Sequence, residues 1–125
     1  MEWVVRAGEA RPEYLVSGYG PHRAVAGLYG LSVQYAPGKT VDELAHAGRF
    51  PNAQISYATD DSLASALQPL GRSMKLISSP GQGYHHTFAV VYDASGVMLT
   101  RLPLALAIVI SQTFQRRSNP LRARP

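Results

Sequence analysis

The sequence predicts an α+β fold: a single domain in which a curved, mainly antiparallel sheet carries two short helices and a C-terminal helix. The chain has 125 residues, a length that fits one domain. Eleven Gly and nine Pro divide it into short elements, and the expected strands and helices do not alternate as they do in parallel βαβ proteins. We therefore expect one domain over residues 1–117, followed by a basic tail over residues 118–125.

Short runs rich in β-branched and aromatic residues predict the strands. The expected strands are residues 3–6, 14–17, 31–35, 52–57, 74–77 and 85–92. The clearest is 31–35, because apolar and polar residues alternate strictly there. Four Gly and one Pro between residues 18 and 30 predict a long loop, and such loops often carry functional sites.

Capping residues predict the helices. Thr40 with Glu43 three positions later has the spacing of a capping box, which predicts a short helix to about residue 47 that stops at Gly48.

Two further helices are expected. Asp60 or Asp61 can cap a second short helix that runs through Leu67. Pro103 suits the first residue of a closing helix that extends to about Arg117. Between the histidine strand and this helix, residues 93–96 are expected to form a turn.

Composition excludes several classes of site. The chain has no Cys, which excludes disulfides, thiolate nucleophiles and cysteine zinc sites, and its four His show no metal-ligand spacing. Residues 38–40 read Gly-Lys-Thr, but Val33 stands where a phosphate-binding P-loop needs its first glycine. No apolar run approaches the roughly 20 residues of a membrane span, and the first residues lack an export-signal pattern. We expect a cytoplasmic protein that uses no metal, cofactor or membrane.

Positive charge concentrates near the C-terminus. The net charge is +4, and residues 94–125 hold five arginines and no acidic residue. These arginines are Arg101, Arg116, Arg117, Arg122 and Arg124. Guanidinium groups bind phosphates and carboxylates. The cluster therefore indicates contact with a phosphate-bearing ligand or an acidic partner, or else a solvated tail.

Two adjacent histidines, His85 and His86, open the expected strand 85–92 after a Gly-rich turn. Histidine transfers protons near neutral pH, and neighbouring side chains of a strand point to opposite faces. One histidine is therefore expected to face the core and the other a cleft or water, but the pattern does not decide which. The alternative is that His86 is a hydrogen-bonded core residue and His85 a strand-end residue without a chemical role.

A proton-transferring histidine and cations that stabilise phosphoryl charge suffice to cleave RNA through its 2′-hydroxyl. The sequence therefore predicts a metal-independent ribonuclease acting on RNA. The residues expected at its site are the catalytic groups His85, His86, Arg23 and Ser56 and the substrate-binding groups Gln54, Arg72, Lys75 and Thr87.

The chain resembles the small toxin domains of bacterial conflict systems in two ways. A basic C-terminal end and a histidine-bearing strand of a curved sheet are similar to ribonuclease toxins of the barnase and RelE type. Arg23, the Gly-Leu-Ser-Val strand that contains Ser32, and the strand opening at His86 are similar to the layout of ADP-ribosyltransferase-like toxins of type VI secretion. This second resemblance implies NAD as a substrate, with Tyr29 or Tyr35 stacking on nicotinamide.

One departure separates the chain from the Arg-Ser-Glu transferases among these toxins. The strand around Ser56 resembles their Ser-centred strand, but every Glu in this chain precedes Ser56. The late Glu that supports their transition state is therefore missing.

The toxin resemblance also implies a partner. We expect a cognate antitoxin or immunity protein, acidic in composition, that neutralises the toxin. A third interpretation is a binding module without enzyme activity that docks an acidic partner through its C-terminal arginines.

Overall fold

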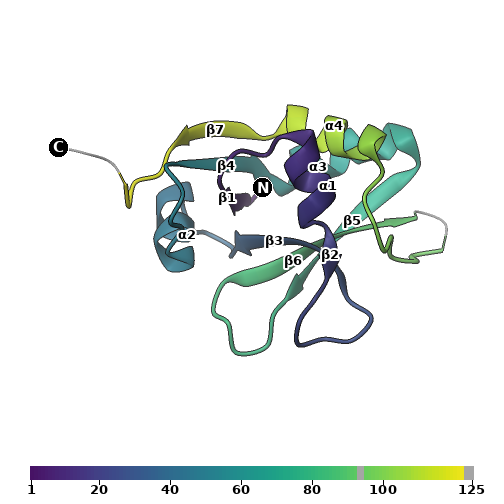
Figure 1. Cartoon of the computed structure of the whole chain (residues 1–125), viewed down its shortest axis with the longest axis horizontal. Helices are drawn as coiled ribbons and strands as arrows, with labels where there is room; N and C mark the ends of the chain where they lie inside the picture. Colours follow the sequence, from purple (N-terminus) through teal and green to yellow (C-terminus); the bar gives the residue numbers. More distant parts are fainter. Residues whose placement is uncertain (93–94, 123–125) are drawn as a thin grey trace.

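The computed structural model describes residues 1–92 and 95–122 and confirms the α+β class. Within these ranges, seven strands form one open antiparallel sheet on which four α-helices pack (Figure 1). The sheet order is β5-β6-β3-β1-β4-β7, and β2 pairs with β3. The strands are β1 (Trp3–Ala7), β2 (Gly20–Pro21), β3 (Tyr29–Tyr35), β4 (Gln54–Thr59), β5 (Arg72–Ser78), β6 (His85–Tyr92) and β7 (Gln115–Ser118). The helices are α1 (Pro12–Gly18), α2 (Val41–Gly48), α3 (Asp60–Leu67) and α4 (Leu104–Thr113), and a 3-10 turn (Gln68–Leu70) follows α3.

The two faces of the sheet are covered differently. Helices α1, α3 and α4 pack on one face and enclose the main core, in which Leu15, Phe88 and Ile110 are fully buried (Figure 1). Helix α2 packs near β1 on the other face, where Val5 and Leu44 belong to a smaller core. Around β3 and β6 this second face carries polar side chains, and cavities open there.

Helix α2 begins and ends as predicted. The Thr40 hydroxyl accepts a hydrogen bond of 3.1 Å from the Glu43 backbone N–H, and the Glu43 carboxylate accepts one of 3.0 Å from the Thr40 N–H. These hydrogen bonds hold the pKa of Glu43 below its ordinary value. The helix ends at Gly48, also as expected.

Most other expected elements are confirmed with small shifts. The strand over residues 85–92 coincides with β6, and β1, β3, β4 and β5 match their predictions within a few residues. Helix α3 spans the expected range, but Thr59 caps it, because its hydroxyl accepts from the Ser62 N–H. The expected loop over 18–30 contains β2 and the start of β3. Residues 93 and 94 of the expected turn lie outside the described residues.

The strand predicted over residues 14–17 is wrong, because these residues lie in α1. Pro12 stands in the first turn of this helix, where its fixed φ is already helical. The negative charge of Glu13, also in the first turn, is stabilised by the positive end of the helix dipole. Leu15 alone in this helix is buried, while Tyr14 and Val16 remain exposed. In so short a helix with a single buried residue, the run of apolar residues around Leu15 reads in the sequence like a short strand.

The closing helix is shorter than predicted. Helix α4 ends at Thr113, and Phe114 adopts an extended conformation and packs into the main core. The chain then forms β7, which pairs with β4, so the expected domain boundary after residue 117 falls inside a strand. Of the helices in the described part of the chain, none, the apolar α4 included, has the length and hydropathy to cross a membrane.

Asn119 ties the end of β7 to the domain, and its loss should destabilise the fold. Its side-chain amide donates 2.8 Å hydrogen bonds to the backbone carbonyls of Phe50 and Asn52, and the residue is fully buried. Asn119→Ala leaves these carbonyls without their partner, so we expect a loss of about 2 kcal/mol of unfolding free energy in urea denaturation. The exposed neighbour provides the control: Ser118→Ala should change stability by less than about 0.5 kcal/mol, and equal effects of both substitutions would contradict this role.

Candidate functional site

The sheet opens between β1 and β3, and this opening forms the floor of the candidate site. The two strands pair only at Val4 with Tyr35 and at Val5 with Gln34. On its other side, β1 continues to pair with β4 as far as Ala7. Strands β1 and β3 therefore part beyond Val5.

The side chain of Arg6 occupies this opening. Its Nη1 donates a hydrogen bond of 2.9 Å to the backbone carbonyl of Ser32 on β3. Gly18 at the end of α1 leaves room for the guanidinium group, because a Cβ there would lie 2.5 Å from Nη2 of Arg6. Burial lowers the pKa of Arg6, and no carboxylate among the described residues forms an ion pair with it. The opening thus holds a partly buried cation whose charge no described carboxylate balances.

Two adjoining cavities lie at this opening. Arg6 and Phe50 line the smaller one, of about 140 Å³. Arg23 and Thr87 line the larger one, of about 230 Å³. Ser32 and His85 line both cavities, so these two polar side chains stand where the cavities meet.

A chain of polar contacts holds His85. Its Nδ1 lies 2.5 Å from Oγ of Ser79, and the same Oγ lies 3.2 Å from Nε2 of His22. Nδ1 of His22 accepts hydrogen bonds from the backbone N–H groups of Ala24 and Val25, at 3.0 and 3.1 Å. These contacts join the loop before β6 to the loop before β3, which lie next to each other at the bottom of Figure 1.

The two adjacent histidines lie on opposite faces of the sheet. Burial lowers the pKa of His85, and the neighbouring His22 and His86 lower it further. The ring of His86 packs edge-on against Tyr35 with 5.2 Å between the centroids, and its Nδ1 lies 2.9 Å from the carbonyl of Tyr84. Of the pair, therefore, His85 faces the cavities.

The structure brings together four of the residues expected at the site, namely His85, Arg23, Ser32 and Thr87. Arg72 and Lys75 on β5 lie elsewhere. The guanidinium of Arg72 stacks 4.3 Å from the ring centroid of Tyr92, on the face opposite His85. Lys75 is exposed and pairs with Ala89 on β6.

The remaining expected residues have structural surroundings. The buried Ser56 hydroxyl donates a 2.7 Å hydrogen bond to the carbonyl of Gly8, on the far side of β1 from β3. Gln54 opens β4 and is exposed. Tyr29 and Tyr35 pack against the main core.

Sequence reasoning missed Arg6, although the sequence carries a signal for it. Strand alternation places Arg6 on the same face as Val4, which points into the main core. Charged residues are rarely placed inward without a partner. A lone arginine at an inward position of an apolar strand was therefore a marker of the site.

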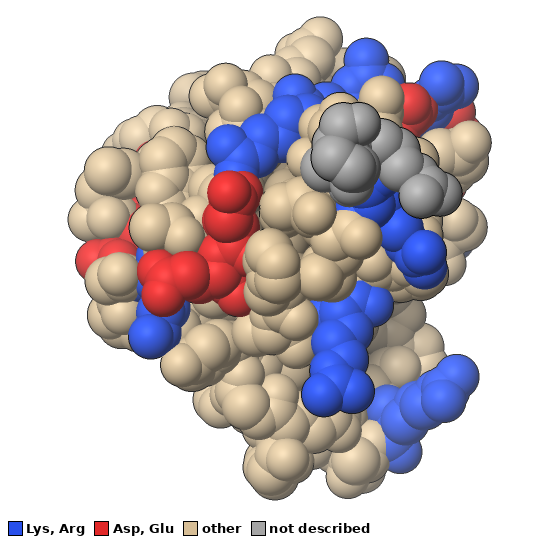
Figure 2. Space-filling view, turned by 90° about the vertical axis from the view of Figure 1, so that its left-hand side faces the viewer, with Lys and Arg blue, Asp and Glu red and all other residues tan. Residues whose placement is uncertain are grey.

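The C-terminal arginines that the structure describes do not line these cavities. Arg116 and Arg117 on β7 form ion pairs with Glu9, at 3.1 Å, and with Asp42. Figure 2 shows one side of the molecule, on which Lys and Arg side chains are spread widely and acidic side chains gather mainly at the left. Arg124 lies outside the described residues.

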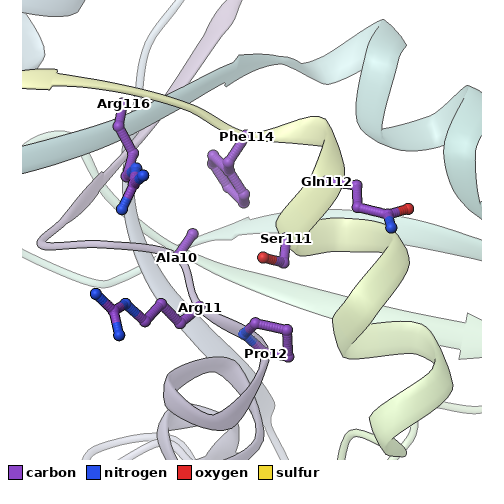
Figure 3. A pocket seen from close by; sticks show the side chains of 7 residues that line it. All are labelled: Ala10, Arg11, Pro12, Ser111, Gln112, Phe114 and Arg116. Atoms are coloured by element: carbon purple, nitrogen blue, oxygen red, sulfur yellow. The ribbon is translucent and has the colours of Figure 1, made fainter.

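A separate cavity of about 460 Å³ lies between the start of α1, the end of α4 and β7 (Figure 3). Arg11 and Arg116 line it, but both form ion pairs with Glu9, which offsets part of their charge. Its lining includes Ser111 and Gln112 but no histidine or carboxylate. Because both arginines of this cavity are paired with Glu9, whereas Arg6 has no carboxylate partner among the described residues, the smaller pair of cavities is the better candidate site for an anionic ligand.

No group of three or more His, Asp or Glu residues among those described is placed to hold a metal ion. Comparisons of the chain with models of protein families, with curated proteins and with solved structures find no match. The function is therefore inferred from the geometry of the site and from the sequence resemblance.

The lowered pKa of His85 predicts how stability depends on pH. In the unfolded chain His85 titrates near the ordinary value of 6.5, whereas the folded protein binds this proton less readily. The contribution of His85 to stability is therefore complete above pH 6.5 and is lost as the pH falls through the folded pKa. Urea denaturation between about pH 8 and 5 should show a steeper loss for the wild type than for His85→Gln. Parallel curves for the two proteins would show that folding does not lower this pKa.

Proposed function

We propose that the protein cleaves NAD at the bond between nicotinamide and ribose and passes the ADP-ribosyl group to water or another acceptor. The observation that carries this proposal is the position of Arg6 in the opening between β1 and β3, beside Ser32 and His85 where two cavities meet. The resemblance of the Ser32 strand to ADP-ribosyltransferase-like toxins supports the same activity, whereas His86, at which the resembling histidine strand opens, lies on the other face of the sheet.

A diphosphate is the chemical group that suits Arg6. Guanidinium groups bind phosphate oxygens through paired, charge-assisted hydrogen bonds. A partly buried cation without a described carboxylate partner gains more from an anion than a surface arginine does, because water screens it less. NAD carries a diphosphate between two nucleosides. The larger cavity adjoins the one that Arg6 lines, and Arg23 in it adds a second positive charge near a diphosphate bound at Arg6.

The site has few groups that transfer protons, and cleavage of the nicotinamide bond needs few. Nicotinamide is a pyridinium in NAD, so the electron pair of the C1′–N bond goes to the ring nitrogen and the leaving group departs neutral, without needing a proton. The acceptor oxygen forms a bond to C1′, and its proton passes to the solvent. No general acid is required for the leaving group. His85, whose Nδ1 is engaged by Ser79, contributes its second ring nitrogen as a hydrogen-bonding group for the ligand.

Ribonuclease activity is the second candidate, because Arg23, Thr87 and His85 line one cavity. Cleavage of RNA through the 2′-hydroxyl needs one group to accept a proton and another to donate one to the leaving oxygen. Both ring nitrogens of His22 are hydrogen-bonded, and His86 lies on the other face of the sheet. The cavity therefore offers one histidine nitrogen where RNA cleavage calls for two groups, and this favours NAD over RNA.

We also propose that this activity makes the protein a toxin that acts in the cytoplasm, as the sequence resemblance implies. A protein that consumes NAD or modifies cell components harms the cell that makes it unless an inhibitor binds it. An acidic antitoxin or immunity protein is the proposed partner.

Substitution of Arg6 tests the activity. Arg6→Lys keeps the charge but loses the paired hydrogen bonds, so nicotinamide release from NAD should fall about 100-fold, equivalent to about 2.7 kcal/mol. Chromatography of the reaction products measures this release. Arg101→Lys, at an exposed arginine away from these cavities, is the matched control and should release nicotinamide at the wild-type rate.

RNA is assayed in parallel with the same proteins. If the wild type degrades RNA and leaves NAD intact, and His85→Gln abolishes the RNA cleavage, the ribonuclease interpretation replaces the NAD proposal. If neither substrate reacts, the proposed enzyme activity is wrong.

A further inference from the structure

We infer that Ser79 is a positioning residue: together with His22 it keeps the proton of neutral His85 on Nε2 and makes His85 a hydrogen-bond donor to the ligand. The identity of that ligand rests on the proposed function, whereas the hydrogen-bond network does not. Ser79 lies in the loop before β6, is only 2% exposed and does not line the cavities. Its part in the site is therefore indirect.

The network starts at His22. Its Nδ1 accepts hydrogen bonds from the backbone N–H groups of Ala24 and Val25, and backbone N–H groups can only donate. Nδ1 of His22 therefore carries no proton. In the neutral ring the proton lies on Nε2, which donates to Oγ of Ser79 at 3.2 Å.

The proton on Nε2 of His22 fixes the orientation of the Ser79 hydroxyl. A hydroxyl has one proton to donate and two lone pairs that accept. Because His22 donates to the oxygen, the Ser79 proton is directed to Nδ1 of His85, at 2.5 Å the shorter of the two contacts. Ser79 is almost completely buried, so water competes little for this proton.

His85 completes the chain. Its Nδ1 accepts from Ser79, so the proton of the neutral ring lies on Nε2. Burial and the neighbouring histidines lower the pKa of His85, which favours this neutral ring. No described residue hydrogen-bonds Nε2 of His85, and His85 is a lining residue of both cavities. The complementary ligand atom is an acceptor, for which a ribose hydroxyl oxygen or a diphosphate oxygen of NAD is suited.

This assignment gives His85 a defined part in the reaction. An Nε2–H group can orient the sugar or the diphosphate but cannot accept a proton from a nucleophile. Proton abstraction at this position would require the opposite tautomer, in which Nδ1 donates to Ser79 and the Ser79 proton loses its acceptor. The network therefore stabilises a binding role for His85 over that of a general base.

The tautomer is measured directly by NMR on the unliganded wild-type protein with ¹⁵N-labelled histidine. We expect the pattern of long-range couplings to show His85 with its proton on Nε2. Ser79→Ala should produce a mixture of the two tautomers and lower kcat/KM for nicotinamide release about tenfold. Ser79→Thr, which retains the hydroxyl, should restore the single tautomer, and Ser78→Ala at the exposed neighbouring position should change neither property.

The outcomes separate the inference from the proposed function. If wild-type His85 carries its proton on Nδ1, or if Ser79→Ala leaves the tautomer unchanged, the positioning role is overturned whatever the enzyme activity. If the tautomers behave as expected but no nicotinamide is released, the network is supported and the NAD activity is overturned. If Ser79→Ala does not fold, the wild-type tautomer together with Ser79→Thr decides the question.

Discussion

The hydrogen bond from Arg6 to the carbonyl of Ser32 replaces the backbone pairing that β1 and β3 give up beyond Val5, and the candidate site depends on it. Paired strands lie about 4.8 Å apart, too close to leave a cavity between them. An arginine side chain spans a larger separation and still satisfies the Ser32 carbonyl. The floor of the site is therefore formed by a side chain with spare donors, where continuous pairing would have left a closed sheet.

This opening carries an energetic cost that a ligand can reduce. Removing a guanidinium group from water is unfavourable unless its donors and its charge are matched. The carbonyl of Ser32 satisfies one donor of Arg6, and a hydrogen bond to a charged group contributes about 1.5–3 kcal/mol. The remaining donors and the charge have no described carboxylate partner. An anion that enters the opening supplies both, so the same feature that weakens the free protein favours anion binding.

One face of the sheet carries the main core, and the other carries the candidate site. The face under α1, α3 and α4 contains the main core, and alternation along β6 places Phe88 and Val90 there. The opposite face of β6 carries His85 and Thr87 at the cavities. Close packing supports this arrangement: a Cβ at Gly30 would lie 2.3 Å from the carbonyl oxygen of Phe88, so the wall of the larger cavity requires a residue without a side chain.

Sequence reasoning was accurate where the determinants are local and failed where they are not. The capping box at Thr40 and the alternation along β6 act within a few residues, so both elements were predicted closely. Strand β7 was missed, because its pairing with β4 depends on a partner some sixty residues earlier in the chain. The contact between His22 and Ser79 likewise joins residues 57 positions apart. Strand alternation marks the inward position of Arg6, but its role arises from the separation of β1 from β3, which the local pattern does not encode.

The charges of the candidate site favour cleavage of NAD over cleavage of RNA. Arg6 and His85 line the same cavity, and the network through Ser79 stabilises the neutral ring of His85. A ribonuclease relies on a histidine that gains and loses a proton, and its charged ring would add a second cation beside Arg6. In the present site the fixed cations Arg6 and Arg23 attract the diphosphate, and a neutral N–H orients the ligand without changing charge. Nicotinamide leaves NAD as a neutral ring and needs no general acid, so this arrangement of permanent cations and one neutral donor suits the nicotinamide bond better than an RNA phosphodiester, although the chain lacks the late Glu of the Arg-Ser-Glu transferases.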